Sequence, residues 1–124
     1  MAGNKRLRPQ PQKRDIPQPK QEKSAVPMFY SETKVEAHKT FYIYRFRAAG
    51  TLLSPMLNVD MKPNKDAKVT IRVELEDFAT EIARPIKAGE NIFDALPVGA
   101  GTLIMIHANV PLDLVEVSYM FREA

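Results

Sequence analysis

Three acidic residues near the middle of the chain have the spacing most suggestive of chemistry. Glu74, Glu76 and Asp77 stand in the segment ELEDF, and two carboxyl groups held close together can serve as a general acid and a general base. The segment Lys68–Glu76, however, alternates strictly between polar and apolar residues, which predicts a strand with one buried and one wet face. Glu74 and Glu76 would share the wet face. A solvated row, or an ion pair with Arg72, is therefore favoured over an acid/base pair.

Nucleophilic and metal chemistry find no support in the sequence. The chain has no cysteine, which removes thiolate nucleophiles, thiolate metal sites and disulfides together. Its few serines lack the GxSxG context of a nucleophile elbow, and the segment PVGAGT lacks the Lys-Ser/Thr pair of a phosphate-binding loop. His107 lies in the apolar run LIMIHANV, which favours a neutral core or interface histidine. We predict no catalytic residue, no metal site, no cofactor and no enzymatic activity.

An aromatic row beside arginines gives a stronger indication of binding. Tyr42, Tyr44 and Phe46 alternate with other residues in TFYIYRFRA, next to Arg45 and Arg47. Such a row could stack nucleic-acid bases on an exposed sheet face. The favoured interpretation is that the aromatic residues belong to the core and the arginines to its rim. The residues predicted for a possible interface are Tyr42, Tyr44, Arg45, Arg47 and His107.

The first 24 residues differ in composition from everything that follows. They contain four prolines, four glutamines, seven basic and two acidic residues, a net charge of +5, whereas the remaining 100 residues carry a net charge of −2. So few apolar residues cannot offset the entropy of ordering by burying themselves. We predict a basic, extended arm over residues 1–24 that orders on a partner. Its partner-binding residues are Lys5, Arg6, Arg8, Lys13, Arg14, Lys20 and Lys23.

Residues 25–39 are predicted to link this arm to the folded body. The segment AVPMFY opens with an apolar cluster that could be a docking plug or a first strand, and the following Ser31–Lys39 is expected to form a loop or a short helical turn. The docking-plug residues are Val26, Met28, Phe29 and Tyr30.

Residues 40–124 read as a β domain. About six segments have strand-like alternation and are separated by Gly, Pro and Asn; in the last one, Val115, Val117, Tyr119 and Phe121 alternate with Leu114, Glu116, Ser118 and Met120. Within Leu53–Met61, the alternation places Leu53, Leu57, Val59 and Met61 on one side of the strand. This pattern predicts an all-β fold, either an antiparallel β-sandwich (jelly-roll or Ig-like) or a small barrel, with an extended N-terminal arm.

The whole-chain features favour a protein that does not enter a membrane. No apolar run approaches the length of about 18 residues that spans a bilayer, and the basic N-terminus lacks the apolar region of a secretory signal. We expect a soluble protein made in a cytoplasm.

The combination of a basic arm from Lys5 to Lys23 with Gly- and Pro-punctuated strands from Thr40 to Phe121 resembles the design of small phage virion proteins, namely capsid decoration or cement proteins and the bases of head fibres. The resemblance implies a location in the virion and a homo-oligomer, with a trimer favoured. It implies that the sandwich oligomerises and that the arm fastens it to a neighbouring protein surface, such as a capsid.

Two alternatives remain from the residues themselves. The first is a nucleic-acid-binding module, in which the basic arm neutralises phosphates and the aromatic and arginine row supplies a sheet face. The second is a carbohydrate-binding sandwich in a host-attachment device, with Phe29 and Tyr30 as exposed aromatic residues.

Overall fold

The computed structural model describes residues 23–124. Within this range the chain forms nine strands and no helix. The strands are β1 (Val26–Val35), β2 (Thr40–Arg45), β3 (Gly50–Asp60), β4 (Lys68–Leu75), β5 (Phe78–Pro85), β6 (Gly89–Ile92), β7 (Leu96–Val98), β8 (Leu103–Ala108) and β9 (Leu112–Glu123).

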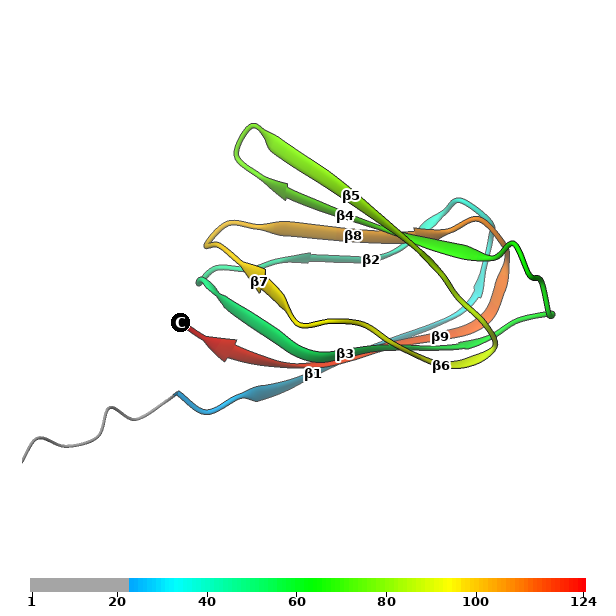
Figure 1. Cartoon of the computed structure of the whole chain (residues 1–124), viewed down its shortest axis with the longest axis horizontal. Helices are drawn as coiled ribbons and strands as arrows, with labels where there is room; N and C mark the ends of the chain where they lie inside the picture. The colour runs from blue at the N-terminus through cyan, green and yellow to red at the C-terminus, as the bar shows by residue number, and fades with distance from the viewer. Residues whose placement is uncertain (1–22) are drawn as a thin grey trace, which may run out of the picture.

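The strands make two antiparallel sheets that lie face to face (Figure 1). Sheet A has the order β1-β9-β3-β6, with the short β7 also paired to β3, and sheet B has the order β2-β8-β4-β5. The prediction of an antiparallel β-sandwich is confirmed, and the described sheets do not close into the alternative small barrel.

The order of pairing identifies the type of sandwich. If the short β7 is set aside, the first strand pairs with the last, the second with the last but one, and β4 pairs with β5 at the centre of the sequence. The third strand, β3, pairs with the third from last, β6. The chain is thus one long hairpin rolled into two layers, which is the topology of a jelly roll.

Alternating side chains from both sheets build the core. In β9, Val115, Val117 and Tyr119 are buried, as the alternation predicts. They face Val69 of β4 and Ile104 of β8 in the opposite sheet, both almost fully buried. The hydrophobic effect stabilises this arrangement by about 1.5–3 kcal/mol for each large aliphatic side chain removed from water.

Strand β1 corrects the predicted domain boundary. Residues 25–39 do not form a linker, because Val26–Val35 is a strand that pairs with β9 along almost all of its length. The loop or helical turn expected over Ser31–Lys39 is reduced to a tight turn before Thr40, with His38 at a φ of 66°. The sandwich therefore begins at Val26.

A bulge in β3 corrects the predicted alternation of that strand. The register against β9 shifts between Leu53 and Met56, where Ser54 has a φ of 49°. Because extra residues in one strand reverse the side to which the following side chains point, Leu52 faces the core before the bulge while Leu57 faces it after the bulge. The prediction that Leu53 shares one side of the strand with Leu57 is wrong.

The start of β3 packs unusually close to the end of β9. A Cβ atom placed on Gly50 would meet the backbone carbonyl oxygen of Arg122 and the ring of Phe121. Glycine is therefore required here by the close approach of two strands.

Candidate functional site

Most of the predicted partner-binding residues of the arm lie outside the described part of the chain. This holds for Lys5, Arg6, Arg8, Lys13, Arg14 and Lys20. Lys23 is described: its Nζ lies 3.6 Å from a carboxylate oxygen of Glu123, and both side chains are exposed. Such a surface ion pair contributes little stability, but it places the beginning of the described chain beside the C-terminal end of β9.

The predicted docking plug is divided between the two faces of β1. Met28 and Tyr30 pack against the core, whereas Phe29 points to solvent with 68% of its surface exposed and Val26 is also exposed. The prediction of one cluster acting together is wrong, because successive residues of a strand point to opposite sides. The same alternation removes Tyr30 from the exposed pair expected for carbohydrate binding.

The aromatic row of β2 belongs to the core. Tyr42 and Phe46 are buried, and only Tyr44 is partly exposed at the sheet edge. The Tyr44 and Phe46 rings meet edge to face with centroids 4.7 Å apart, and Phe46 also packs on Phe121 of sheet A at 5.1 Å. The aromatic residues therefore join the two sheets, and a base-stacking face that includes Tyr42 is ruled out by its burial.

The rim interpretation of the two arginines fits their positions. Arg45 and Arg47 are exposed, and Arg45 Nη1 donates a hydrogen bond to the carbonyl oxygen of Gly101 at 3.0 Å. His107 is half-buried on the solvent side of sheet B, opposite Thr40 and Thr70. It is thus a surface residue of a central strand rather than a core residue.

Two buried tyrosines form a polar link across the core. The Tyr42 and Tyr119 hydroxyl oxygens lie 2.5 Å apart, and the two side chains are 5% and 4% exposed. Burial, followed by the hydrogen bond to Tyr119, raises the pKa of Tyr42 far above its ordinary value, and burial is also the main cause that raises the pKa of Tyr119. Both hydroxyls are neutral at physiological pH.

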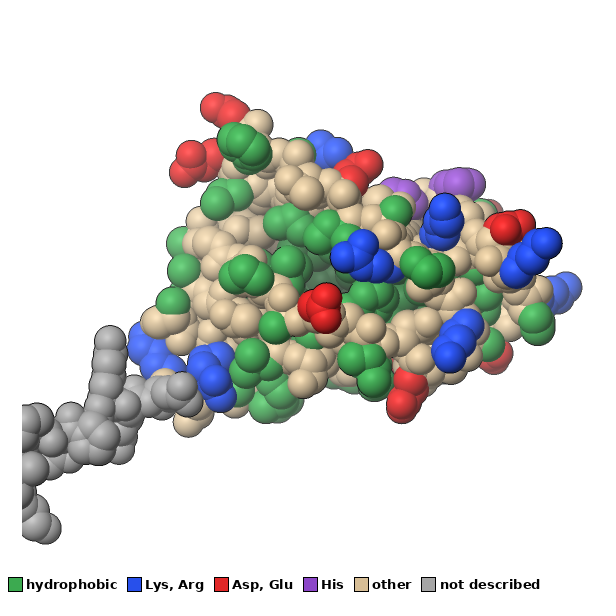
Figure 2. All heavy atoms as spheres, in the orientation of Figure 1, with side chains coloured by type: hydrophobic (Ala, Val, Ile, Leu, Met, Phe, Trp, Pro, Cys, Tyr) green, Lys and Arg blue, Asp and Glu red, His purple; other side chains and the backbone are tan. Residues whose placement is uncertain are grey.

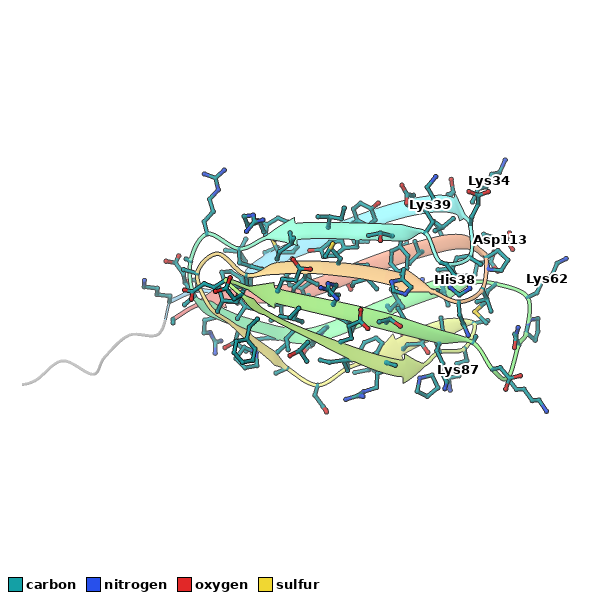
Figure 3. The ribbon with its side chains drawn as sticks, turned by 90° about the horizontal axis from the view of Figure 1, so that it is seen from above. Lys34, His38, Lys39, Lys62, Lys87 and Asp113 are labelled. Carbon is teal, nitrogen blue, oxygen red and sulfur yellow. The ribbon has the colours of Figure 1, made fainter. Side chains whose placement is uncertain are left out.

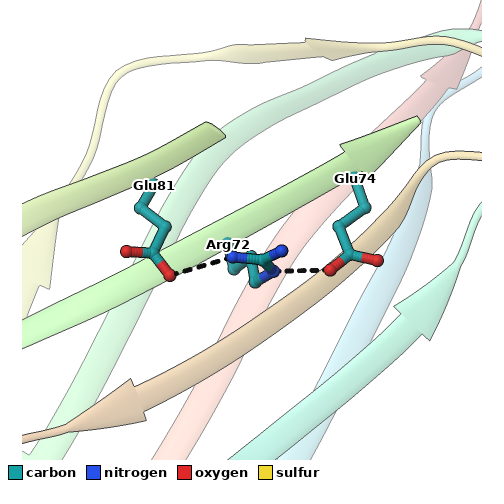
Figure 4. Close-up of polar contacts among 3 residues, drawn as sticks. All are labelled: Arg72, Glu74 and Glu81. Atoms are coloured by element: carbon teal, nitrogen blue, oxygen red, sulfur yellow. Dashed lines mark hydrogen bonds and ion pairs between the residues drawn. The ribbon is translucent and has the colours of Figure 1, made fainter. Parts of the chain in front are cut away.

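The predicted carboxylate cluster is an ion-pair arrangement. Arg72 Nε donates to Glu74 Oε2 at 2.5 Å and Arg72 Nη1 donates to Glu81 Oε2 at 3.2 Å (Figure 4). The hydrogen bond to Glu74 is the main cause that raises the pKa of Arg72. Glu76 does not share the strand face, because it stands in the β4–β5 turn with a φ of 54°. The ion pair predicted between Arg72 and Glu74 is confirmed.

An uncharged surface on the solvent side of sheet A was not predicted. One cross-strand row joins Phe29 of β1, Ser118 of β9, Met56 of β3 and Ile92 of β6. The adjacent row joins Pro27, Met120 and Leu53. We call these seven residues the sheet A patch. Ile92 is 76% exposed and Met120 is 37% exposed.

The sheet A patch ends at an acidic row. The next residues along the same face are Ser31, Glu116, Asn58 and Glu90, followed by Asp60. Glu116 accepts a hydrogen bond from Asn58 Nδ2 at 2.8 Å. One half of the face is therefore apolar and the other half carries carboxylates, an arrangement of apolar centre and polar rim that is typical of protein interfaces.

Basic side chains gather at the far end of the sandwich. Figure 3 shows four lysines together with His38 and Asp113 at the end opposite to the start of β1. The lysines are Lys34, Lys39, Lys62 and Lys87. They come from loops and strand ends that are distant in sequence, so no charge run announces them.

Residues 23–124 contain no group of three or more His, Asp or Glu residues placed to hold a metal ion. No helix in this range is long and apolar enough to cross a membrane. Comparison with models of known protein families finds no match for this chain, and comparison with curated proteins finds no relative.

Proposed function

We propose that this protein is a non-enzymatic structural subunit that assembles with copies of itself through sheet A and is fastened to a neighbouring protein surface by its basic arm. The observation that carries the proposal is the sheet A patch, which crosses β1, β9, β3 and β6 on the solvent side and in which every residue except Ser118 is apolar. The wet face of an antiparallel sheet is normally polar, and contiguous apolar patches on a protein surface mark interaction sites.

A second copy of the chain is the partner that the charges favour. The folded body has a net charge of −2 and the arm has a net charge of +5, and the acidic row lies on the same face as the sheet A patch. When two copies pack through this face, the arm of one can run along the acidic row of the other. Opposite charges across an interface speed encounter and fix its register.

The assembly that we propose is a virus particle, with the protein in the role of a capsid decoration or cement protein and a trimer as the favoured oligomer. Its support is the resemblance in design to small phage virion proteins and the jelly-roll topology, which recurs in viral capsid and lectin domains. A fold by itself assigns no function, so the proposal is tested by measuring the self-association of the isolated protein and its variants.

The oligomer interface can be tested by replacing Phe29 or Ile92 with serine. We expect the unaltered protein to be an oligomer by size-exclusion chromatography with light scattering. Each variant should weaken self-association by about thirtyfold, the effect of losing an interface hot spot of about 2 kcal/mol.

Ile43→Ser is the matched control for these variants. Ile43 is an apolar residue with 62% of its surface exposed, but it lies on the outer face of sheet B, opposite Met105. Its replacement should leave the mass unchanged, and circular dichroism should show all three variants folded. A monomeric parent protein, or equal loss of association in Ile43→Ser, would contradict the interface.

The role of the arm can be tested with a chain that begins at Ser24. Because β1 begins at Val26 and the Lys23–Glu123 pair is exposed, the free energy of unfolding in urea should change by no more than about 0.5 kcal/mol. Self-association should become weaker and lose its dependence on salt, as measured by sedimentation velocity at low and moderate ionic strength.

The same pair of chains tests the alternative of nucleic-acid binding by the basic arm. Binding through the arm predicts that the full chain binds heparin tightly, that this binding falls steeply with salt, and that it disappears on truncation. If these results are found and truncation leaves self-association unaffected, the arm binds nucleic acid and the assembly role assigned to it is wrong.

A further inference from the structure

A cavity of about 210 Å³ lies between the two sheets. It is found on the side of the sandwich where β5 and β6 are the edge strands, and Figure 2 shows a hollow lined mainly by hydrophobic side chains on that face. Its walls include Leu57 and Val117 of sheet A and Ile71 and Ile106 of sheet B. Met56 of the sheet A patch also lines the cavity, whereas the other six residues of the patch do not.

The cavity exists because the sheets are incompletely covered on this side. Strand β6 has only four residues and is followed by the segment 93–95 before β7 pairs with the other end of β3. Phe93 N donates to the Pro55 carbonyl oxygen at 2.9 Å, which anchors this segment across the β3 bulge. Ile71 faces inward yet is only half-buried, so apolar surface remains available to another molecule.

The volume sets the size of a suitable ligand. An apolar cavity of about 150 Å³ stays dry and binds benzene, so a cavity of about 210 Å³ has room for a benzene ring with a small substituent. Arg84 and Asp94, with opposite charges, both line the cavity, so its two described charged groups balance. Together with the apolar walls, this balance favours an uncharged ligand.

The tyrosine pair supplies one polar feature. Tyr42 and Tyr119 both line the cavity, and their mutual hydrogen bond uses one of the two hydroxyl hydrogens. The other hydroxyl hydrogen of the pair can therefore be donated to a further oxygen. A ligand oxygen that accepts this hydrogen would gain a hydrogen bond within mainly apolar walls.

We propose that the cavity is a binding site for a small, uncharged, mainly apolar molecule, about the size of a substituted benzene, with one oxygen that accepts a hydrogen bond from the Tyr42–Tyr119 pair. This inference is independent of the proposed assembly role. It assigns a ligand-binding site to the protein, whereas the sequence predicts no cofactor.

Acetophenone and isopropylbenzene are suitable probes because they have nearly the same shape and differ in a carbonyl oxygen. Titration of the isotope-labelled full chain, followed by NMR amide shifts, should show saturable binding of both, with the shifts concentrated on cavity residues. The hydrogen bond to its carbonyl oxygen should raise the affinity of acetophenone by about threefold to tenfold above the affinity that its apolar surface alone provides.

Two variants test the location and the chemistry. Ile71→Phe fills the cavity and should weaken binding of both probes by about tenfold or more, whereas Ile43→Phe, on the outer face of sheet B, should not change it. The double variant Y42F/Y119F should weaken acetophenone binding by about threefold to tenfold and leave isopropylbenzene binding unchanged. Replacing both partners of a hydrogen bond by apolar groups of the same shape is nearly neutral for folding.

The proposal is overturned if neither probe saturates, or if Ile71→Phe and Ile43→Phe have the same effect. Equal effects of the tyrosine replacement on both probes would overturn the hydrogen bond to the ligand oxygen. Thermal melts of each variant establish that the folded protein is the species titrated.

Discussion

Replacing Gly50 by alanine is expected to destabilise the protein by about 3 kcal/mol or more, a large effect for one methyl group. The added Cβ would overlap the carbonyl oxygen of Arg122 and the ring of Phe121. The carbonyl belongs to the backbone of β9 and takes part in the central pairing of sheet A, so it cannot move without disturbing the ladder. Overpacking of a rigid site typically costs about 1–3 kcal/mol, and more where backbone must shift.

Gly99→Ala is the matched control for this prediction. A Cβ at Gly99 would meet chiefly the end of the Leu75 side chain, at 3.1 Å, and a flexible side chain can move by a few tenths of an ångström. We expect a change below about 1 kcal/mol. Urea unfolding followed by circular dichroism measures both values, and equal stability of the two variants would refute the close approach of β3 and β9.

Alkaline pH is expected to unfold this protein because of the tyrosine pair. The pKa values of Tyr42 and Tyr119 are raised in the folded state, mainly by burial. Below the ordinary tyrosine pKa of about 10 both states hold their protons and the stability is fully present. Above it the unfolded chain ionises while the folded chain does not, so stability falls by about 1.4 kcal/mol per pH unit for Tyr42, and Tyr119 acts in the same direction.

The double variant Y42F/Y119F isolates this effect from the titration of lysines, which both proteins share. Between pH 9 and pH 11 the parent should lose stability more steeply than the variant, measured as the urea midpoint at each pH. The two curves should coincide in slope between pH 6 and pH 9. Parallel curves over the whole range would show that the hydroxyls ionise freely and would refute their burial.

The sequence was informative where side chains alternate along one strand. The alternation in β9 predicts that Val115, Val117 and Tyr119 share one side of the strand, and all three are buried. In β2, the favoured interpretation of the aromatic residues as core is confirmed by the burial of Tyr42 and Phe46. These predictions succeed because period-two alternation is a local property that tertiary contacts do not alter.

Features built from several strands could not be read in the same way. The sheet A patch brings Phe29, Met56 and Ile92 into one row although 27 and 36 residues separate them along the chain. The outward position of Met56 also depends on the β3 bulge, which reverses the sides of the strand.

The boundary of the folded body was misplaced for a similar reason. Pro27 and the polar residues that follow it weaken the alternation of β1, so the sequence leaves a docking plug and a first strand open for AVPMFY and predicts a loop or helical turn from Ser31 on. In the structure this strand is held by its pairing with β9, and Pro27 is tolerated because β1 lies at the edge of its sheet.

The position of β1 also decides how the body would respond to mechanical load. Its first residue, Val26, pairs with Phe121 near the end of β9, and the pairing continues to Val35 opposite Leu112. Tension applied through residue 23, away from a body anchored by its sheet face, acts along the strand and loads this ladder in shear, so that many bonds must fail together. Tension between residue 23 and the C-terminal end of β9, which the Lys23–Glu123 ion pair brings close together, would instead peel β1 from β9 one bond at a time. The fold thus resists pulling in the direction in which a tether would pull.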